Sequence, residues 1–237
     1  MPREASSQVS AGSPQSGELL RLEVREGVAV SGRLIVPPGA RALYVLAHGA
    51  GAGMDHPSLS STAADLAALG IATLRYQFPY MEQRKGRPDP PAVCHATVRA
   101  AVAEAARRAP QLPTFAGGRS FGGRMTSQAQ AQRELPGVRG LVLLGFPLHA
   151  AKQPADERAR HLGEVHIPML FVQGTRDALA ERTLMHEAVA RLGSRATLAW
   201  VEDADHSFHV PARSGRSDAE VRRALLGDVA RWMAGLL

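Results

Sequence analysis

Residues 114–125 read TFAGGRSFGGRM, a short apolar segment followed by Ser120 between two pairs of glycines. Gly118, Ser120 and Gly122 fit the pattern G-x-S-x-G. Residues 114–118 are expected to form a strand and 121–134 a helix, which is the strand–turn–helix context that this pattern requires. The serine then adopts a strained backbone conformation at a sheet edge, and the glycines leave room where strand and helix cross. Alternatively, the segment is a flexible turn in which Ser120 caps the helix, although a cap does not require four glycines.

Apolar segments and helical patterns alternate on both sides of this motif. Strands are expected at 28–36, 43–47, 71–76, 114–118, 140–146, 169–173 and 197–201, and helices at 58–69, 92–109, 121–134, 181–192 and 218–236. This alternation predicts an α/β fold, a mostly parallel central sheet flanked by helices on both faces. The insertions at 78–91 and 147–168 follow strands, so both are expected at the carboxyl edge of the sheet, where such folds bind ligands.

The chain has 237 residues, 45% of them hydrophobic, which suits one globular domain. We expect a single domain over residues 18–237, without a large cap domain, preceded by a disordered tail at 1–17 that is rich in Ser, Pro, Gln and Gly. The single cysteine, Cys94, excludes an intrachain disulfide. It falls within the helix expected at 92–109, and we expect its thiol to lie in the core.

The formal net charge of +6 raises the question of a nucleic-acid partner. The basic residues are nearly all arginines, but they are scattered along the chain, and aromatic residues make up only 5%. Such a chain lacks a stacking platform, so we expect no nucleic-acid partner. No apolar run is long enough to cross a membrane, and residues 1–17 lack the apolar segment of a secretory signal. We therefore expect a cytoplasmic protein, a monomer or small homo-oligomer, without membrane contact.

A serine hydroxyl becomes a strong nucleophile when a base removes its proton. In folds with the G-x-S-x-G pattern, an acidic residue and then a histidine follow the serine along the chain. His206 comes shortly after the strand at 197–201, which predicts that it lies at the same sheet edge as Ser120. His209 is the rival, but it lies nearer to the next helix. Asp177 follows the strand at 169–173 and would orient the histidine; its alternative role is a turn or helix cap.

Two other ligand sites can be considered. Asp203 and Asp205, with the two nearby histidines, could form a metal site, but no cysteine or distant ligand pair completes it, and we expect no metal. The glycine-rich turn at 48–53 could bind a dinucleotide, but the third glycine of G-x-G-x-x-G is replaced by Met54 or His56. We expect this turn instead to supply a backbone donor to an oxyanion, from Ala50 or, as second choice, Gly51. The other donor would be the N–H of Phe121.

The two insertions are expected to line a substrate pocket. One wall would comprise Phe78, Tyr80 and Met81, and the opposite wall Phe146, Leu148 and His149. These side chains could equally be anchored in the core. Arg119 and Arg176 adjoin the candidate catalytic residues. Either could bind an anionic substrate group or pair with a nearby carboxylate.

Several motifs together resemble a known family, the small α/β-hydrolases near the dienelactone hydrolases. The motifs are HGAG at 48–51, GRSFGG at 118–123, GFPLH at 145–149, FVQGTRD at 171–177 and DHSF at 205–208. That branch includes bacterial proteins and the hydrolase-like domains of a testis-expressed vertebrate protein and of a chromatin-complex subunit. The resemblance covers about residues 28–237 and implies a catalytic triad of Ser120, Asp177 and His206 without a cofactor. This chain differs from the dienelactone hydrolases in having serine, not cysteine, as the expected nucleophile.

These patterns lead to two hypotheses on function. The first is a serine hydrolase that cleaves a small carboxylic ester or thioester through an acyl-enzyme intermediate. The second is a non-catalytic interaction module that keeps the hydrolase fold. An interaction module has no need of Ser120, Asp177, His206 and the glycine turn together, so the sequence favours the enzyme.

Overall fold

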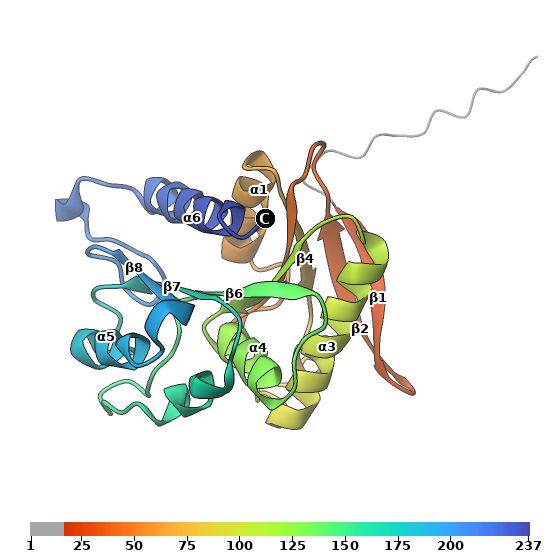
Figure 1. Cartoon of the computed structure of the whole chain (residues 1–237), viewed down its shortest axis with the longest axis horizontal. Coiled ribbons are helices and arrows are strands. Elements are labelled where there is room, and N and C mark those ends of the chain that lie inside the picture. Colours follow the sequence, from red (N-terminus) through yellow and green to blue (C-terminus); the bar gives the residue numbers. More distant parts are fainter. Residues whose placement is uncertain (1–16) are drawn as a thin grey trace, which may run out of the picture.

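The structure, a computed structural model, describes residues 17–237 of the chain. Apart from Gly17, the predicted tail therefore lies outside the described residues. An eight-stranded sheet forms the centre of the molecule, in the order β1-β2-β4-β3-β5-β6-β7-β8 (Figure 1). The strands are β1 (Glu18–Arg25), β2 (Val28–Ile35), β3 (Ala42–Ala47), β4 (Ile71–Tyr76), β5 (Thr114–Arg119), β6 (Val138–Leu144), β7 (Met169–Gly174) and β8 (Ala196–Val201).

Strands β3 to β8 run parallel to one another, and β1 and β2 form an antiparallel edge in which β2 pairs with β4. The prediction of a mostly parallel sheet is therefore confirmed. Strand β1 was not among the predicted strands. It alternates buried Leu20 and Leu22 with exposed residues and turns into β2 at Gly27, whose φ is 73°. The hairpin with β2 stabilises it at the edge of the sheet.

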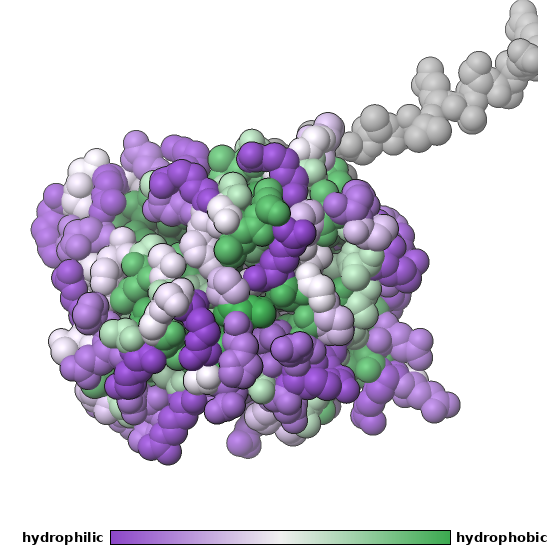
Figure 2. All heavy atoms as spheres, viewed as in Figure 1, coloured by the Kyte–Doolittle hydropathy of each residue, from purple (hydrophilic) through white to green (hydrophobic). Residues whose placement is uncertain are grey.

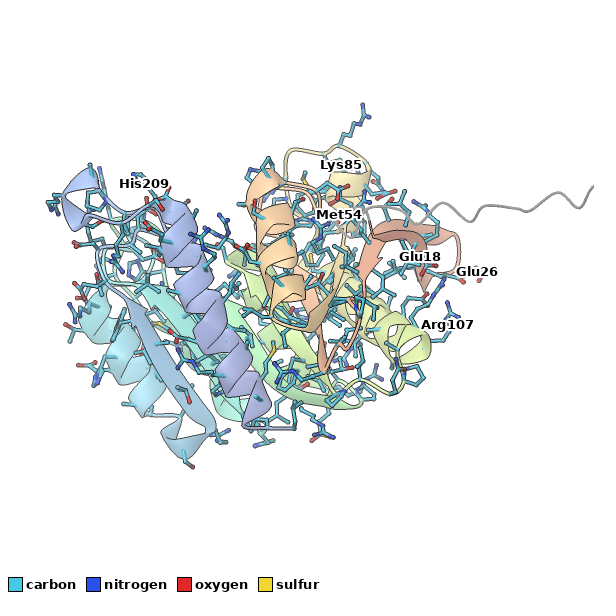
Figure 3. The ribbon with its side chains drawn as sticks, turned by 90° about the horizontal axis from the view of Figure 1, so that it is seen from above. Glu18, Glu26, Met54, Lys85, Arg107 and His209 are labelled. Carbon is cyan, nitrogen blue, oxygen red and sulfur yellow. The ribbon has the colours of Figure 1, made fainter. Side chains whose placement is uncertain are left out.

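Helices cover both faces of the sheet, as predicted (Figure 1). Helices α1 and α6 pack on one face, where they lie side by side when the molecule is seen from above (Figure 3). Helices α3, α4 and α5 pack on the other face. Their bounds are α1 (Pro57–Ala68), α3 (Pro91–Arg108), α4 (Phe121–Gln132), α5 (Arg182–Ala190) and α6 (Asp218–Ala234).

The insertions predicted to be non-strand segments contain short helices of their own. Helix α2 (Pro79–Glu82) lies in the first, and the 3₁₀ segment η1 (Glu157–Glu164) lies in the second. Two further 3₁₀ turns, η2 (Gly193–Arg195) and η3 (Ala212–Ser214), lie between the later elements. Neither insertion forms a separate cap domain, and η1 packs against α4.

The central strands are buried on both faces. All six residues of β3, β4 and β7 are buried. Strand β3 accordingly reads as a continuous apolar run, whereas β4 and β7 include the buried polar residues Thr73, Arg75 and Gln173. Cys94 is buried in α3, as predicted, and burial raises the pKa of its thiol to about 12, which makes it unreactive.

Among residues 17–237, no helix has the length and apolar character needed to cross a bilayer. The face in Figure 2 is largely hydrophilic around its outline, with hydrophobic residues showing mainly toward its middle.

The topology brings four chain segments to one edge of the sheet. The glycine-rich turn follows β3, Ser120 follows β5, Asp177 follows β7 and His206 follows β8. Because all four strands are parallel, their carboxyl ends meet at the same edge. Segments up to about 160 residues apart in sequence thus converge there.

Candidate active site

Ser120 lies at a sharp turn between β5 and α4. Its backbone has φ 49° and ψ −115°, a combination that a residue with a Cβ rarely adopts. Gly118 and Gly122 allow the turn to lie against the end of β3, because a Cβ on them would lie 2.4 Å from the Ala47 oxygen and 2.5 Å from the His48 oxygen, respectively. Gly118 and Gly122 thus leave room for the end of β3 and not, as was predicted, for the crossing of β5 and α4. At that crossing the close contact is at Gly123, whose Cβ would lie 2.8 Å from the Gly118 oxygen.

The Ser120 hydroxyl points to a histidine, and it does not cap the helix. Although Ser120 occupies the N-cap position of α4, its side chain makes no capping hydrogen bond. Its Oγ lies 2.8 Å from His206 Nε2. The structure therefore disagrees with the alternative in which Ser120 serves as a helix cap.

His206 is held between the serine and Asp177. Its Nδ1 lies 2.7 Å from Asp177 Oδ2, and the Asp177 side chain is fully buried. A carboxylate can only accept, so Nδ1 carries the proton and Nε2 is free to accept the Ser120 hydroxyl hydrogen. The three side chains form one continuous hydrogen-bonded chain, with the imidazole in the tautomer that a general base requires.

Asp177 is itself fixed by two further donors. Gln173 Nε2 donates to Oδ2 at 2.5 Å, and the Leu179 N–H donates to Oδ1 at 2.8 Å. The second bond is the Asx turn that was considered as an alternative role, so Asp177 forms this turn and also contacts His206. The sequence analysis did not identify Gln173, and one sequence offers no signal for it.

The His206 loop is anchored by a side chain from the serine turn. Arg119 Nη2 donates to the His206 carbonyl oxygen at 2.9 Å, and its guanidinium lies 5.1 Å from the centre of the Phe208 ring. Burial lowers the pKa of Arg119, while the carboxylates of Asp205 and Asp177 act in the opposite direction. Arg119 is thus in direct contact with the histidine loop. Arg176, the other arginine considered as a binding site for an anionic substrate group, is exposed.

The rival histidine lies elsewhere. His209 is exposed near the start of α6 (Figure 3), with Nδ1 2.9 Å from an Asp218 oxygen. Asp205 accepts the backbone N–H groups of Ser207 and His209 and so shapes the loop. Within residues 17–237, no group of three or more His, Cys, Asp or Glu side chains is arranged to hold a metal ion.

The glycine-rich turn is braced by a buried histidine. His48 Nε2 accepts the Phe78 N–H at 3.1 Å, and Nδ1 donates to the Gly49 carbonyl at 2.8 Å. Burial lowers the pKa of His48 to about 4, so the ring is neutral in this tautomer. In a trans peptide the C=O and the next N–H point in opposite directions. Holding the Gly49 carbonyl therefore directs the Ala50 N–H away from His48. The sequence analysis assigned His48 no such role.

The other proposed donor, Phe121, is the first residue of α4. Its N–H has no carbonyl partner within the helix, as for any residue in a first helical turn. Ala50 lines the same cavity as Ser120, whereas Gly51 is exposed with φ 75° and does not line it. The geometry thus agrees better with Ala50 than with Gly51 as the second donor.

A cavity of about 420 Å³ opens over Ser120. Its walls come from the glycine-rich turn, the start of α1, and the loops after β7 and β8. The lining residues are His48, Gly49, Ala50, Ala52, Gly53, His56, Ser58, Leu59, Arg119, Ser120, Leu179, His206 and Ser207.

The substrate-wall predictions for the two insertions do not agree with this cavity. Tyr80, Phe146 and Leu148 are buried in the core; the Phe146 ring packs 5.8 Å from Phe171. His149 is buried and accepts the Glu181 N–H at the start of α5, and Met81 packs against the core from α2. Of the residues proposed as substrate-binding, Arg119 lines the cavity. The others are core anchors, the alternative that the sequence left open.

Comparisons with known proteins also indicate a hydrolase fold. A family model described as alpha/beta hydrolase domain matches residues 40–234. The structure is similar to an alpha-beta serine hydrolase homologue from Coxiella burnetii, with a TM-score of 0.72 and 21% identity, over 90% of this chain and 97% of that one. It is also similar to a dienelactone hydrolase from Anabaena variabilis, with a TM-score of 0.71 and 21% identity, over 94% and 99% of the two chains.

A third similar structure is an α/β serine hydrolase without a lid from Xanthomonas campestris. It has a TM-score of 0.70 and 21% identity, over 92% of this chain and 95% of that one. At this identity the likeness concerns the fold. The absence of a separate cap domain among residues 17–237 agrees with a lidless arrangement.

Proposed function

Because the chain belongs to the α/β-hydrolase family, we propose that it is a serine hydrolase that cleaves a small carboxylic ester or thioester through an acyl-enzyme intermediate. One observation carries the proposal. Ser120 Oγ, His206 and Asp177 form an unbroken hydrogen-bonded chain that opens onto a cavity. A serine turn that served only as structure would not require this alignment of a nucleophile, a base and a buried carboxylate.

In the first half of the reaction, Ser120 Oγ attacks the carbonyl carbon of the substrate while His206 Nε2 takes its proton. The resulting tetrahedral intermediate collapses, the bond to the leaving alcohol or thiol breaks, and His206 returns the proton to it. The acyl group remains on Ser120. Asp177 holds the Nδ1 tautomer and stabilises the imidazolium that forms during attack.

In the second half, a water molecule attacks the acyl-enzyme. His206 takes a proton from this water and then returns it to Ser120 Oγ, releasing the carboxylic acid. In both halves the negative oxygen of the intermediate would be stabilised by the N–H groups of Phe121 and Ala50, with Gly51 as the second choice. All steps use groups of this chain, so the proposal requires no cofactor.

The size of the cavity supports a small substrate. Its volume of about 420 Å³ is near the lower end of the range for small-molecule sites. Leu59 and Leu179 provide apolar contacts for a short acyl or alcohol group. The dienelactone hydrolase among the similar structures does not fix the substrate of this chain.

A fluorophosphonate probe tests the nucleophile, because it reacts covalently with an activated serine. We expect rapid labelling of the wild type, complete loss in Ser120→Ala, and normal labelling in the matched control Ser127→Ala, whose hydroxyl in α4 contacts His161 instead. Labelling that persists unchanged in Ser120→Ala would discard this serine. Near-normal ester hydrolysis in His206→Gln would overturn the base assignment.

A panel of 4-nitrophenyl esters and acyl thioesters of increasing acyl length then defines the substrate range. We expect turnover that is highest for short acyl groups and falls as the chain exceeds the cavity. A folded wild-type protein that neither reacts with the probe nor hydrolyses any of these compounds would contradict the enzyme proposal and favour an interaction module.

A further inference from the structure

The cavity over Ser120 is electrostatically one-sided. None of the described residues that line it is acidic, and Arg119 is the one arginine or lysine among them. Arg119 also lines a second cavity, but there Asp218 and Arg222 bring charges of both signs. Arg119 is therefore the one described lining residue with a permanent positive charge, and the carboxylates that act on this charge, those of Asp205 and Asp177, are not among the lining residues.

The Arg119 guanidinium has N–H donors that its hydrogen bond to His206 does not use. Its guanidinium carries five N–H groups, and one of its terminal nitrogens, Nη2, is used on the His206 carbonyl. The ion pairs formed among residues 17–237 do not include Arg119, whereas Arg222 on the neighbouring helix is paired with Asp65 at 2.6 Å. Burial lowers the pKa of Arg119 even though the carboxylates of Asp205 and Asp177 act in the opposite direction, so an anion supplied from outside would further offset the cost of burying this charge.

The start of α1 faces the same cavity. His56, the N-cap residue, lines it together with Ser58 and Leu59 from the first turn. The positive end of the helix macrodipole thus points at the space beside Arg119. The first turn contains no acidic side chain that would neutralise it. Two independent features, a guanidinium and a helix N-terminus, favour a negative charge at this place.

We propose that the substrate carries a carboxylate a few bonds from its scissile carbonyl and that Arg119 binds this carboxylate; the inference rests on the proposed ester or thioester hydrolysis. Arg119 directly precedes Ser120, and both line one cavity of limited volume. The two ends of a short half-ester of a dicarboxylic acid would reach them together. A carboxylate accepts paired N–H bonds from a guanidinium, a geometry that a neutral group does not reproduce.

The experiment compares matched charged and neutral substrates. Monoethyl succinate carries the carboxylate, and ethyl 4-oxopentanoate replaces it with a methyl ketone of similar shape. A second pair, acetoxyacetate and acetoxyacetone, places the charge on the alcohol side. The kcat/KM of each is measured in the wild type, in Arg119→Gln and in Arg176→Gln, which removes an exposed arginine that does not line the cavity.

We expect the wild type to prefer the charged member of at least one pair by roughly tenfold to a hundredfold, as for a hydrogen-bonded charge pair. The preference should vanish in Arg119→Gln and persist in Arg176→Gln. A purely positional role of Arg119 would lower both members equally and leave their ratio unchanged.

A wild-type ratio near one in both pairs, or a preference that survives in Arg119→Gln, would overturn the inference. Those outcomes still involve turnover of the neutral esters. Failure of the proposed function would look different, because then neither the charged nor the neutral ester would be hydrolysed and the fluorophosphonate probe would not label Ser120.

Discussion

Arg119 Nη2 donates a hydrogen bond to the carbonyl oxygen of His206 at 2.9 Å, so the residue before the candidate nucleophile holds the loop of the candidate base. Ser120 and His206 are 86 residues apart in the sequence, and the contact between them depends on how the serine turn and the histidine loop lie relative to each other. Stacking of Arg119 over Phe208 adds a second contact to the same loop. The distance between nucleophile and base is thereby set by one side chain as well as by the strands.

This contact predicts a defect in Arg119→Gln even on neutral esters. We expect kcat to fall by roughly tenfold, because the imidazole is less well held, while KM changes little. The measurement is steady-state kinetics on 4-nitrophenyl acetate. Arg119→Lys, which keeps the charge without the planar fork, should recover only part of kcat. An unchanged kcat in both variants would show that the strands alone position His206.

Removal of the carboxylate behind the base should be severe. Asp177→Asn would leave the shape of the side chain but favour the wrong imidazole tautomer, since the amide can donate to Nδ1. We expect kcat to fall by about 10⁴-fold with little change in KM. Thermal unfolding checks the cause. A tautomer defect should leave the unfolding temperature close to that of the wild type, whereas a large loss would indicate misfolding of the loop.

Much of this arrangement follows from sequence patterns, and the exceptions have physical reasons. Strand β3 is recognisable as a continuous apolar run, and Ser120, Asp177 and His206 each follow a strand, which predicts that they meet at one edge of a parallel sheet. Strand β1 is harder to recognise, because its two buried leucines have the charged Arg21 between them and it depends on pairing with β2.

The cavity walls show where sequence reasoning stops. Phe146 and Leu148 are apolar residues in an insertion beside the site, a pattern that is the same whether they line a pocket or fill the core. Their burial depends on packing against residues such as Phe171, which no local pattern encodes. The bracing role of His48 likewise depends on the direction of its ring, which places one nitrogen on Phe78 and the other on Gly49.

His48 predicts a dependence of stability on acid pH. Burial lowers its pKa in the folded state to about 4, from an ordinary 6.5. Between these values the unfolded chain binds a proton at this residue that the folded chain excludes. The free energy of unfolding should therefore fall as the pH drops below 6.5 and continue to fall until about 4, by at most ~3 kcal/mol from this residue. Urea denaturation across pH 4 to 7 measures the slope.

The variant His48→Asn tests the assignment of that slope. Asparagine can donate to the Gly49 carbonyl but does not titrate, so the variant should be less stable at pH 7 and should depend less steeply on pH. His161, whose pKa burial also lowers to about 4, would account for part of the slope that remains. A slope identical to that of the wild type would mean that His48 does not contribute to it.

The strained backbone of Ser120 predicts that the presence of a serine at this position lowers the stability of the fold. With φ 49° and ψ −115°, any residue with a Cβ is strained there, whereas glycine is not. Ser120→Gly and Ser120→Ala both remove the hydroxyl and should both lower kcat by roughly 10⁴- to 10⁶-fold. They should differ in stability, with the glycine variant more stable by about 1 kcal/mol, since the relief of strain exceeds the entropy that glycine adds to the unfolded chain. Thermal and urea unfolding of the two variants give this difference directly, because the lost hydrogen bond to His206 is common to both. An alanine variant as stable as the glycine variant would show that the turn relaxes once the hydroxyl is gone, and that the hydrogen bond to His206, not the surrounding glycines and strands, keeps the serine strained.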